Sequence, residues 1–335
     1  MDDSFFLLVL IIIAALAFGF SNGMNDAANA IATVVGSRVL SPRKAILMAA
    51  TCNATGTLVG VLVWNAWVAK TIGKGIIGYE DFTLCTVIAG VVAAVIWVVA
   101  ATRYGMPVSV THSLVAGLLG AGLAAGGADI IVWGKLTPVL SAVVFAPLLG
   151  FACAFAGMVL IMHLFRHVGP SKVNRTFSYL QIVSSGFVSF SHGSNDGQMS
   201  IAIMALGLGI YYGKPFDDFP LWVVFVSASC VALGIACGGW RVVRTVGTKI
   251  TTLRPVHGFA AETSGAMVIA AASRLGIPVS TTHATSASVM GVGATRRLSA
   301  VRWGIASSIL MAWLLTFPAC ALLGWVLGRF MGLIS

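Results

Sequence analysis

The sequence predicts an all-α polytopic membrane protein, built as an inverted-topology repeat with broken or re-entrant helices. Three observations lead to this fold class. Of 335 residues, 58% are hydrophobic and only 9% are charged, whereas about a quarter of a soluble domain is charged. Apolar runs such as 45–68 and 139–164 are long enough to span a hydrocarbon core of roughly 30 Å. Two motifs also recur half a chain apart.

The repeated motifs indicate one internal duplication. Phe20–Ala32 (FSNGMNDAANAIA) and Phe190–Ala202 (FSHGSNDGQMSIA) are identical at seven of thirteen positions. Arg103–Gly120 and Arg274–Gly291, each with a Pro-Val-Ser-x-Thr-His segment, are identical at nine of eighteen. The offsets of 170 and 171 residues agree, so a single duplication explains both pairs.

Each half contains five apolar stretches that we expect to cross the membrane in alternating directions. An odd number of crossings per half places the second half in the opposite orientation, a common plan of transporters. We therefore predict two inverted repeats, residues 1–165 and 166–335. The stretches are 5–36, 45–68, 83–103, 107–127 and 138–165, followed by 178–212, 221–240, 257–274, 278–295 and 303–330.

The first stretch of each half is longer than one span and carries a polar patch in its middle. A patch facing lipid would be costly, so we expect 5–36 and 178–212 to break at their glycines or to form re-entrant hairpins. Glycine and proline also interrupt the two Pro-Val-Ser-x-Thr-His segments. Whether those segments cross fully or are re-entrant stays open.

The net charge of +10 arises from basic residues in four short loops. Such loops are cytoplasmic under the positive-inside rule, so we interpret the charge as a topology signal and expect no nucleic-acid partner. This places both termini outside and the 166–175 loop inside, in a multi-pass protein of the inner (plasma) membrane. The basic residues are Arg38, Arg43 and Lys44; Arg166, Lys172 and Arg175; Arg241, Arg244, Lys249 and Arg254; and Arg296, Arg297 and Arg302.

Three of the ten acidic residues lie within apolar stretches: Asp26, Asp196 and Glu262. A carboxylate inside a membrane costs at least ~2.5 kcal/mol and marks a functional site by default. Asp26 and Asp196 occupy equivalent positions after Asn25 and Asn195, so we predict that these four residues form a cation-coupling site, with sodium as the bound metal if coupling uses sodium. Capping of a broken helix is the alternative. Glu262 is a candidate for a separate ion or a salt bridge.

The Pro-Val-Ser-x-Thr-His segments supply anion-binding chemistry. Proline suits a first helical position and serine or threonine can cap the helix, so each segment is expected to start a half-helix whose positive end faces the site. Two such starts could hold a tetrahedral oxyanion. A divalent anion beside two aspartates would gather four negative charges, so cations or protons must accompany it. The candidate donors are Ser109, Thr111, Ser280, Thr281 and Thr282.

These motifs resemble the inorganic phosphate transporter (PiT) family over nearly the whole chain. The resemblance rests on Gly23–Ala30 (GMNDAANA), Gly193–Asp196 (GSND) and the paired Pro-Val-Ser-x-Thr-His segments. It implies sodium- or proton-driven symport of inorganic phosphate by an inverted-repeat core, often in a homodimer. A large soluble loop of eukaryotic relatives has no counterpart, which indicates a prokaryotic member. The family's site residues map to Asn25, Asp26, Ser109, Thr111, Asn195, Asp196, Ser280, Thr281 and Thr282.

The chain departs from internal symmetry in one place that bears on function. Gly197–Ser200 (GQMS) stands where the first half has Ala27–Ala30 (AANA), so Gln198 becomes a further candidate for substrate binding. Two alternatives to phosphate symport stay open: a sulfate transporter of the same family and an ion channel. The sequence has no HExxH, GxSxG or CxxC motif, and we expect neither an enzyme nor a cofactor.

Overall fold

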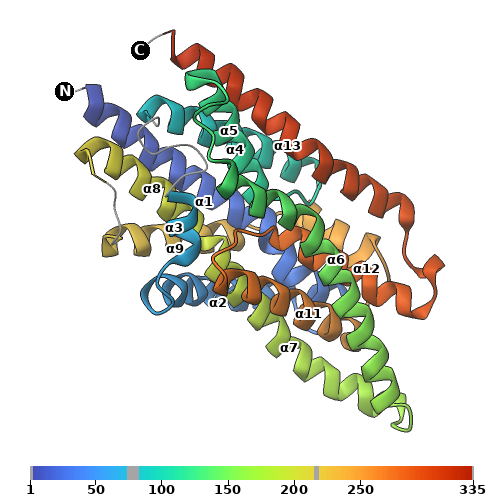
Figure 1. Cartoon of the computed structure of the whole chain (residues 1–335). Coiled ribbons are helices and arrows are strands. Elements are labelled where there is room, and N and C mark those ends of the chain that lie inside the picture. Colours follow the sequence, from blue (N-terminus) through green and yellow to red (C-terminus); the bar gives the residue numbers. More distant parts are fainter. Residues whose placement is uncertain (1–2, 74–82, 215–218, 334–335) are drawn as a thin grey trace.

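All regular elements of the described residues are helices (Figure 1). The computed structural model describes residues 3–73, 83–214 and 219–333. The prediction of an all-α fold is confirmed. In chain order the elements are α1 (Asp3–Gly36), α2 (Pro42–Leu62), α3 (Trp67–Gly73), α4 (Leu84–Tyr104), α5 (Val110–Gly126), α6 (Trp133–Leu164), α7 (Pro170–Asn195), α8 (Gly197–Tyr212), α9 (Leu221–Cys237), α10 (Trp240–Arg244), the π-helical turn η2 (Thr245–Lys249), α11 (Pro255–Arg274), α12 (Thr281–Arg296), the 3₁₀ turn η3 (Leu298–Ala300) and α13 (Trp303–Met331).

Five helices of the described ranges, α1, α2, α4, α6 and α13, are long and apolar enough to cross a membrane. A sixth candidate is α9 with α10 and η2, which together bend by 60°. In contrast, α5 and α12 have 17 and 16 residues. At 1.5 Å per residue they reach roughly 25 Å, less than the hydrocarbon core of roughly 30 Å. Neither helix is therefore counted among the candidate spans.

The short helices belong to two hairpins, α4–α5 and α11–α12, whose arms pack against each other. Thr83, which caps α4, lines one cavity with Ala124 near the end of α5. Likewise Thr251, just before α11, packs against Gly293 near the end of α12. Each hairpin therefore returns to the end of the molecule from which it started, and its short second arm favours the re-entrant alternative that the sequence left open.

The turns of the two hairpins meet in the centre of the protein. Gly105 and Gly276 adopt left-handed backbone angles after α4 and α11 (φ 75° and 67°), a conformation that glycine adopts without steric cost. The Oγ1 atom of Thr111, at the start of α5, lies 3.2 Å from the carbonyl oxygen of Val279, just before α12. The two half-helices thus begin next to each other, one from each half of the chain.

Serine residues cap both half-helices, as expected. The Oγ atoms of Ser109 and Ser280 accept hydrogen bonds of 3.1 Å from the backbone N–H groups of His112 and His283. The prolines do not occupy the first helical position as predicted, but lie three residues before it. They restrict the backbone leading into the cap, because the proline ring fixes φ and disfavours helix in the preceding residue.

The expected break is absent from the first motif, because α1 is continuous through its polar patch. The second motif has a one-residue break at Asp196, between the end of α7 and the motif glycine Gly197 that begins α8. The patch of α1 is buried against other helices instead of lipid, so no unwinding is needed there. The glycines permit this close contact. A Cβ atom at Gly23 would lie 2.1 Å from the carbonyl oxygen of Val231, and one at Gly193 would lie 2.0 Å from that of Asn53.

We expect the Gly193→Ala variant to be less stable than the wild type by about 1–3 kcal/mol, because the added methyl group forces α7 away from α2. Thermal unfolding of the purified protein in detergent measures the effect as a lower Tm. Gly304→Ala is the control, since a Cβ atom there meets nothing within 4 Å. Equal Tm values for the two variants would contradict the proposed close packing.

Two apolar clusters enclose a polar centre. One contains Ile11, Phe18 and Met199, and the other contains Ile31 and Val292. The polar residues of α1 lie between these clusters, after Phe18 and before Ile31. The core is therefore layered along the helix axes, with the polar site near the middle.

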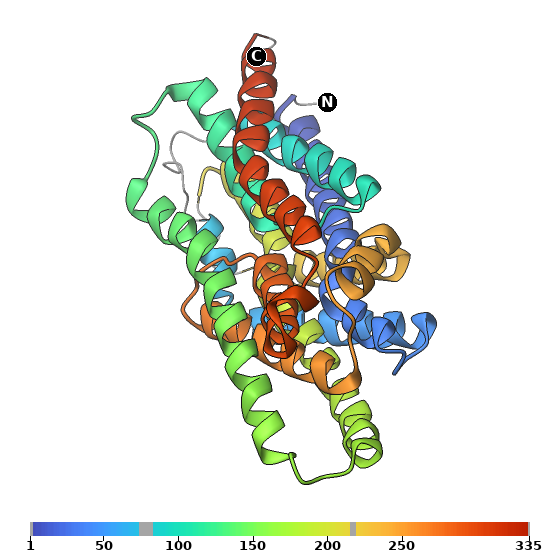
Figure 2. The ribbon, with the colours of Figure 1, turned by 90° about the vertical axis from the view of Figure 1, so that its right-hand side faces the viewer.

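The ends of the chain and the basic loops lie at opposite ends of the molecule. The start of α1 and the end of α13 are together, and the connection between α6 and α7 is at the far end (Figures 1 and 2). Arg38 and Arg254 line one cavity with residues of that connection, and the backbone N–H of Arg302 donates to Ile250. Segments from all four basic loops thus gather at one end, here called the basic end.

Helices at equivalent positions in the two halves pack reciprocally. α13 contacts α4 and α5, and its counterpart α6 contacts α11 and α12. Similarly, α2 packs on α7 while α9 packs on α1. Each half therefore covers the hairpin and first helix of the other half, and residues from both halves meet at the centre.

Candidate functional site

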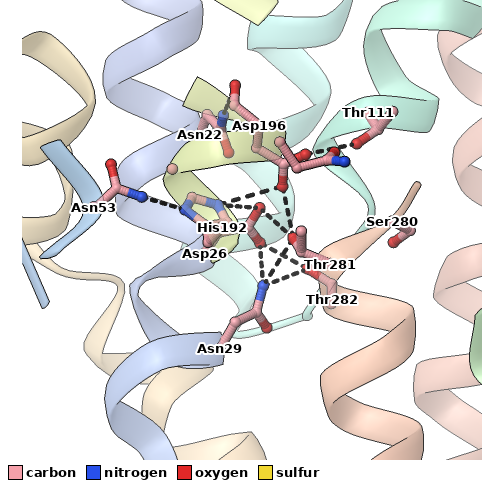
Figure 3. A network of polar contacts seen from close by, with 12 residues as sticks. Asn22, Asp26, Asn29, Asn53, Thr111, His192, Asp196, Ser280, Thr281 and Thr282 are labelled. Carbon is pink, nitrogen blue, oxygen red and sulfur yellow. Dashed lines mark hydrogen bonds and ion pairs between the residues drawn. The ribbon is translucent and has the colours of Figure 1, made fainter. Parts of the chain in front are cut away.

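Asp26 of α1 and Asp196 between α7 and α8 lie together in the polar centre (Figure 3). Both are buried, with 2% and 1% of their surface exposed. Thr281, the first residue of α12, is placed between them: its Oγ1 lies 2.6 Å from Asp196 Oδ2 and 3.5 Å from Asp26 Oδ2. A hydroxyl has one hydrogen, so Thr281 donates to Asp196 at the shorter distance.

Further donors surround each carboxylate. Asp26 Oδ1 accepts hydrogen bonds from Thr282 Oγ1 at 2.7 Å and from Asn29 Nδ2 at 3.0 Å. Asp196 Oδ1 accepts one from Thr111 Oγ1 at 3.2 Å. The N-terminal residues of α5 and α12 therefore bind the aspartates through their hydroxyl groups. Of the predicted residues, the structure brings together the two aspartates and the three threonines.

His192 is a member of this site that the sequence analysis missed. Its Nε2 atom lies 3.3 Å from both Asp26 Oδ2 and Asp196 Oδ2, and its Nδ1 atom is 2.6 Å from Asn53 Nδ2. Ligand atoms of His192 and the two aspartates lie within 4.8 Å of one another, close enough to hold one metal ion. The available signal was the spacing: His192 precedes Asp196 by four residues, which puts both on one helix face.

Asn25 and Asn195 make matched hydrogen bonds to residues other than the aspartates. Asn25 Nδ2 donates to Thr102 Oγ1 at 2.7 Å, and Asn195 Nδ2 donates to Ser273 Oγ at 2.9 Å. Thr102 and Ser273 are themselves repeat equivalents. The Oδ1 atoms of both asparagines are buried without a hydrogen-bond partner among the described residues. An unsatisfied buried acceptor costs about 1–3 kcal/mol, and a bound cation would satisfy it.

The side chain of Gln198 is held outside the network. Its Oε1 atom accepts from the backbone N–H of Ala69 in α3 at 3.0 Å, and its Nε2 atom donates to the carbonyl of Ser194 at 2.7 Å. Both polar groups are therefore occupied by contacts that attach α3 to α7 and α8. In this structure Gln198 does not contact either aspartate.

Glu262 of α11 lies at a second position, closer to the basic end. It accepts hydrogen bonds from Thr33 Oγ1, from Ser184 Oγ and, at 3.1 Å, from Gln181 Nε2. No lysine or arginine within the described ranges forms an ion pair with it. A cavity of about 10 Å³, lined by Glu262, Thr33 and Asn29 among others, separates it from the Asp26 network. The geometry therefore does not favour the salt-bridge interpretation of Glu262.

A bundle of apolar helices, with two helical hairpins meeting at a buried pair of carboxylates, defines a multi-pass membrane transport protein. Comparison with known proteins is more specific. Residues 22–324 match the phosphate transporter family. The chain belongs to this family, and it is a transporter and not an enzyme, as the sequence predicted.

Relatives cover almost the entire chain. A protein of Rhizobium meliloti (strain 1021), named "Probable low-affinity inorganic phosphate transporter", is 44% identical over 96% of this chain and 95% of its own length. A Bacillus subtilis (strain 168) protein of the same name is 37% identical over 97% of both chains. A solved structure described as "The sodium-dependent phosphate transporter" matches with a TM-score of 0.90 and 28% identity, covering 98% of this chain and 100% of that one.

Proposed function

We propose that the protein is a secondary active symporter that carries inorganic phosphate together with sodium ions or protons. The observation that carries this proposal is the buried pair Asp26 and Asp196, bound by hydroxyl groups at the start of α12. The inorganic phosphate named for the relatives supports the substrate. The sodium dependence named for the structural neighbour supports sodium as the coupling ion.

The charge of the site gives the physical reason for coupling. Two unit charges 4 Å apart repel by about 4 kcal/mol at an effective dielectric constant near 20. A hydrogen phosphate dianion beside Asp26 and Asp196 would meet two such charges in a site closed to water. Cations or protons that neutralise the carboxylates remove this repulsion, so anion and cation binding favour each other.

In this mechanism the carboxylates exchange their threonine partners for cations, and the threonine hydroxyl groups exchange the carboxylates for phosphate. Cations bind the carboxylates of Asp26 and Asp196, with the free Oδ1 atoms of Asn25 and Asn195 as neighbouring acceptors. The hydroxyl groups of Thr111, Thr281 and Thr282, which now bond the carboxylates, then become free to donate to phosphate. Ser109 and Ser280 position these groups by capping α5 and α12. Glu262 serves as a separate cation site. Gln198, which supports α3 in this structure, would have to reorient in order to bind phosphate.

The halves 1–165 and 166–335 are proposed to form inverted repeats that expose this site to each side in turn. Support comes from the reciprocal packing of equivalent helices and from hairpins that start at opposite ends and meet at Thr111 and Val279. Sites at such repeat interfaces are typical of alternating-access transporters. We also propose a homodimer in the bilayer, as the family resemblance implies.

The proposed topology places the basic end inside the cell and both termini outside. Single cysteines replacing Asp2, Lys172 and Ser335, in a background without native cysteines, test it with an impermeant thiol reagent added to intact cells. We expect labelling at positions 2 and 335 and protection at 172, because basic loops are retained in the cytoplasm. Protection of position 2 together with labelling of 172 would reverse the topology.

Uptake into proteoliposomes tests the function directly. With radiolabelled phosphate and separately imposed sodium and proton gradients, we expect concentrative, saturable uptake with one of the two gradients. Arsenate should compete and sulfate should not, because a protonated oxyanion can donate to a carboxylate and sulfate has no proton to donate. Inhibition by sulfate alone would identify a sulfate carrier. Flux without saturation or counterflow would identify a channel.

A further inference from the structure

A large cavity lies at the basic end, away from the aspartates. Its volume is about 910 Å³, within the range of roughly 300–1,000 Å³ that is usual for ligand pockets. The walls come from the α1–α2 connection, the last turns of α6, the beginning of α7 and the segment that leads into α11. Figure 2 shows α6 and α7 extending together to this end of the molecule.

The polar side of the cavity is positively charged. Arg38 and Arg254 line it, both with exposed side chains, and none of the lining residues is acidic. Ser37, Asn174 and Ser178 add neutral hydrogen-bonding groups. The cavity also borders the first turns of α7 and α11, where helix dipoles add positive potential. This chemistry fits a phosphate ester or another anionic headgroup.

The residues that α6 contributes to the cavity are apolar. Met158, Ile161, Met162 and Phe165 form this wall. Leu164 on the same helix is 64% exposed, as expected for a side chain facing lipid. A small inorganic anion would make no favourable contact with such a wall. An amphiphile would bind the basic residues with its headgroup and the apolar residues with its chains.

We propose that this cavity binds an anionic phospholipid, with its phosphate group at Arg38 and Arg254 and its acyl chains along α6. Basic pockets between membrane helices on the cytoplasmic side are typical sites for anionic lipid headgroups. The occupant is a component of the bilayer and differs from the transported phosphate. The inference does not depend on the proposed transport mechanism.

A lipid in this cavity would act on the transport core through a short hydrogen-bonded chain. Ser37, which lines the cavity, donates to Gln181 Oε1 at 2.8 Å. Gln181 Nε2 in turn donates to Glu262. A phosphodiester oxygen is an acceptor, so a headgroup at Ser37 would compete with Gln181 Oε1 for the single hydroxyl hydrogen of Ser37 and would thereby change the hydrogen bonds around Glu262.

Native mass spectrometry of the delipidated full-length protein tests the proposal with added phosphatidylglycerol and phosphatidylcholine. We expect selective retention of phosphatidylglycerol, and at least about tenfold weaker retention by the double variant Arg38→Gln/Arg254→Gln. The matched control is Arg43→Gln/Arg297→Gln, which removes the same charge from the basic end at residues that do not line the cavity. Thermal unfolding confirms that both variants are folded.

The possible results separate the lipid from other occupants. Retention by the control and loss by the cavity variant support the site. Equal retention by both variants, equal loss from both, or equal binding of the two lipids would overturn it. Release of phosphatidylglycerol by excess inorganic phosphate would assign the cavity to the free anion instead. None of these readouts requires transport, so a failure here differs from a failure of the proposed symport.

Discussion

Replacing either Asp26 or Asp196 by asparagine is expected to abolish concentrative phosphate uptake. Each carboxylate accepts hydrogen bonds from residues at the starts of α5 or α12 and provides half of the negative charge at the proposed cation site. An amide keeps the size of the side chain and removes its negative charge. The site then has too little charge to bind a cation, and the gradient cannot drive phosphate inward. Radiolabelled phosphate accumulation in proteoliposomes measures the loss.

The matched control is Asp129→Asn, because Asp129 is exposed between α5 and α6. This variant should accumulate phosphate like the wild type. Elution as a single species from a sizing column shows that the two site variants are folded. Normal accumulation by either folded site variant would rule out its carboxylate as a cation-coupling group.

The internal duplication explains why much of the site could be predicted from the sequence. Identical residues at equivalent positions identified Asp26 with Asp196 and Thr111 with Thr282. The structure places these residues in one network because both copies of each motif reach the centre. The same reasoning favoured symmetric residues and overlooked asymmetric ones. In the alignment of the two repeats, Asn29 corresponds to Met199 and His192 corresponds to Asn22. Both Asn29 and His192 nevertheless contact the aspartates.

The course of the helices was harder to predict than the site. A polar patch in an apolar stretch suggests unwinding only if the patch faces lipid, and sequence periodicity does not reveal which helices will cover it. Gly23 and Gly193 allow α9 and α2 to pack directly over the patches, so α1 remains helical throughout. Gln198 was assigned from its position in the second motif alone, whereas its orientation depends on the position of α3.

Thr281→Val is expected to reduce the rate of phosphate uptake by roughly 10–100-fold. Thr281 Oγ1 donates to Asp196 and also lies near Asp26, so one hydroxyl connects the carboxylates from the two halves. A hydrogen bond to a charged group contributes about 1.5–3 kcal/mol, which corresponds to that range of rates if the hydroxyl is passed to phosphate during transport. Valine has a similar shape, so packing at the start of α12 is preserved.

Two further variants test whether the loss of the Thr281 hydroxyl group is itself the cause of the slower uptake. Thr281→Ser keeps the donor and should retain most of the uptake, since only a methyl group is lost. Thr295→Val removes a hydroxyl at the other end of α12, where its partner is the carbonyl of Val292, and should transport normally. If the Thr281→Val variant transported phosphate at a rate within twofold of the wild type, the Thr281 hydroxyl group would not take part in phosphate binding. The anion site would then have to consist of the remaining hydroxyl groups and the backbone of the half-helices.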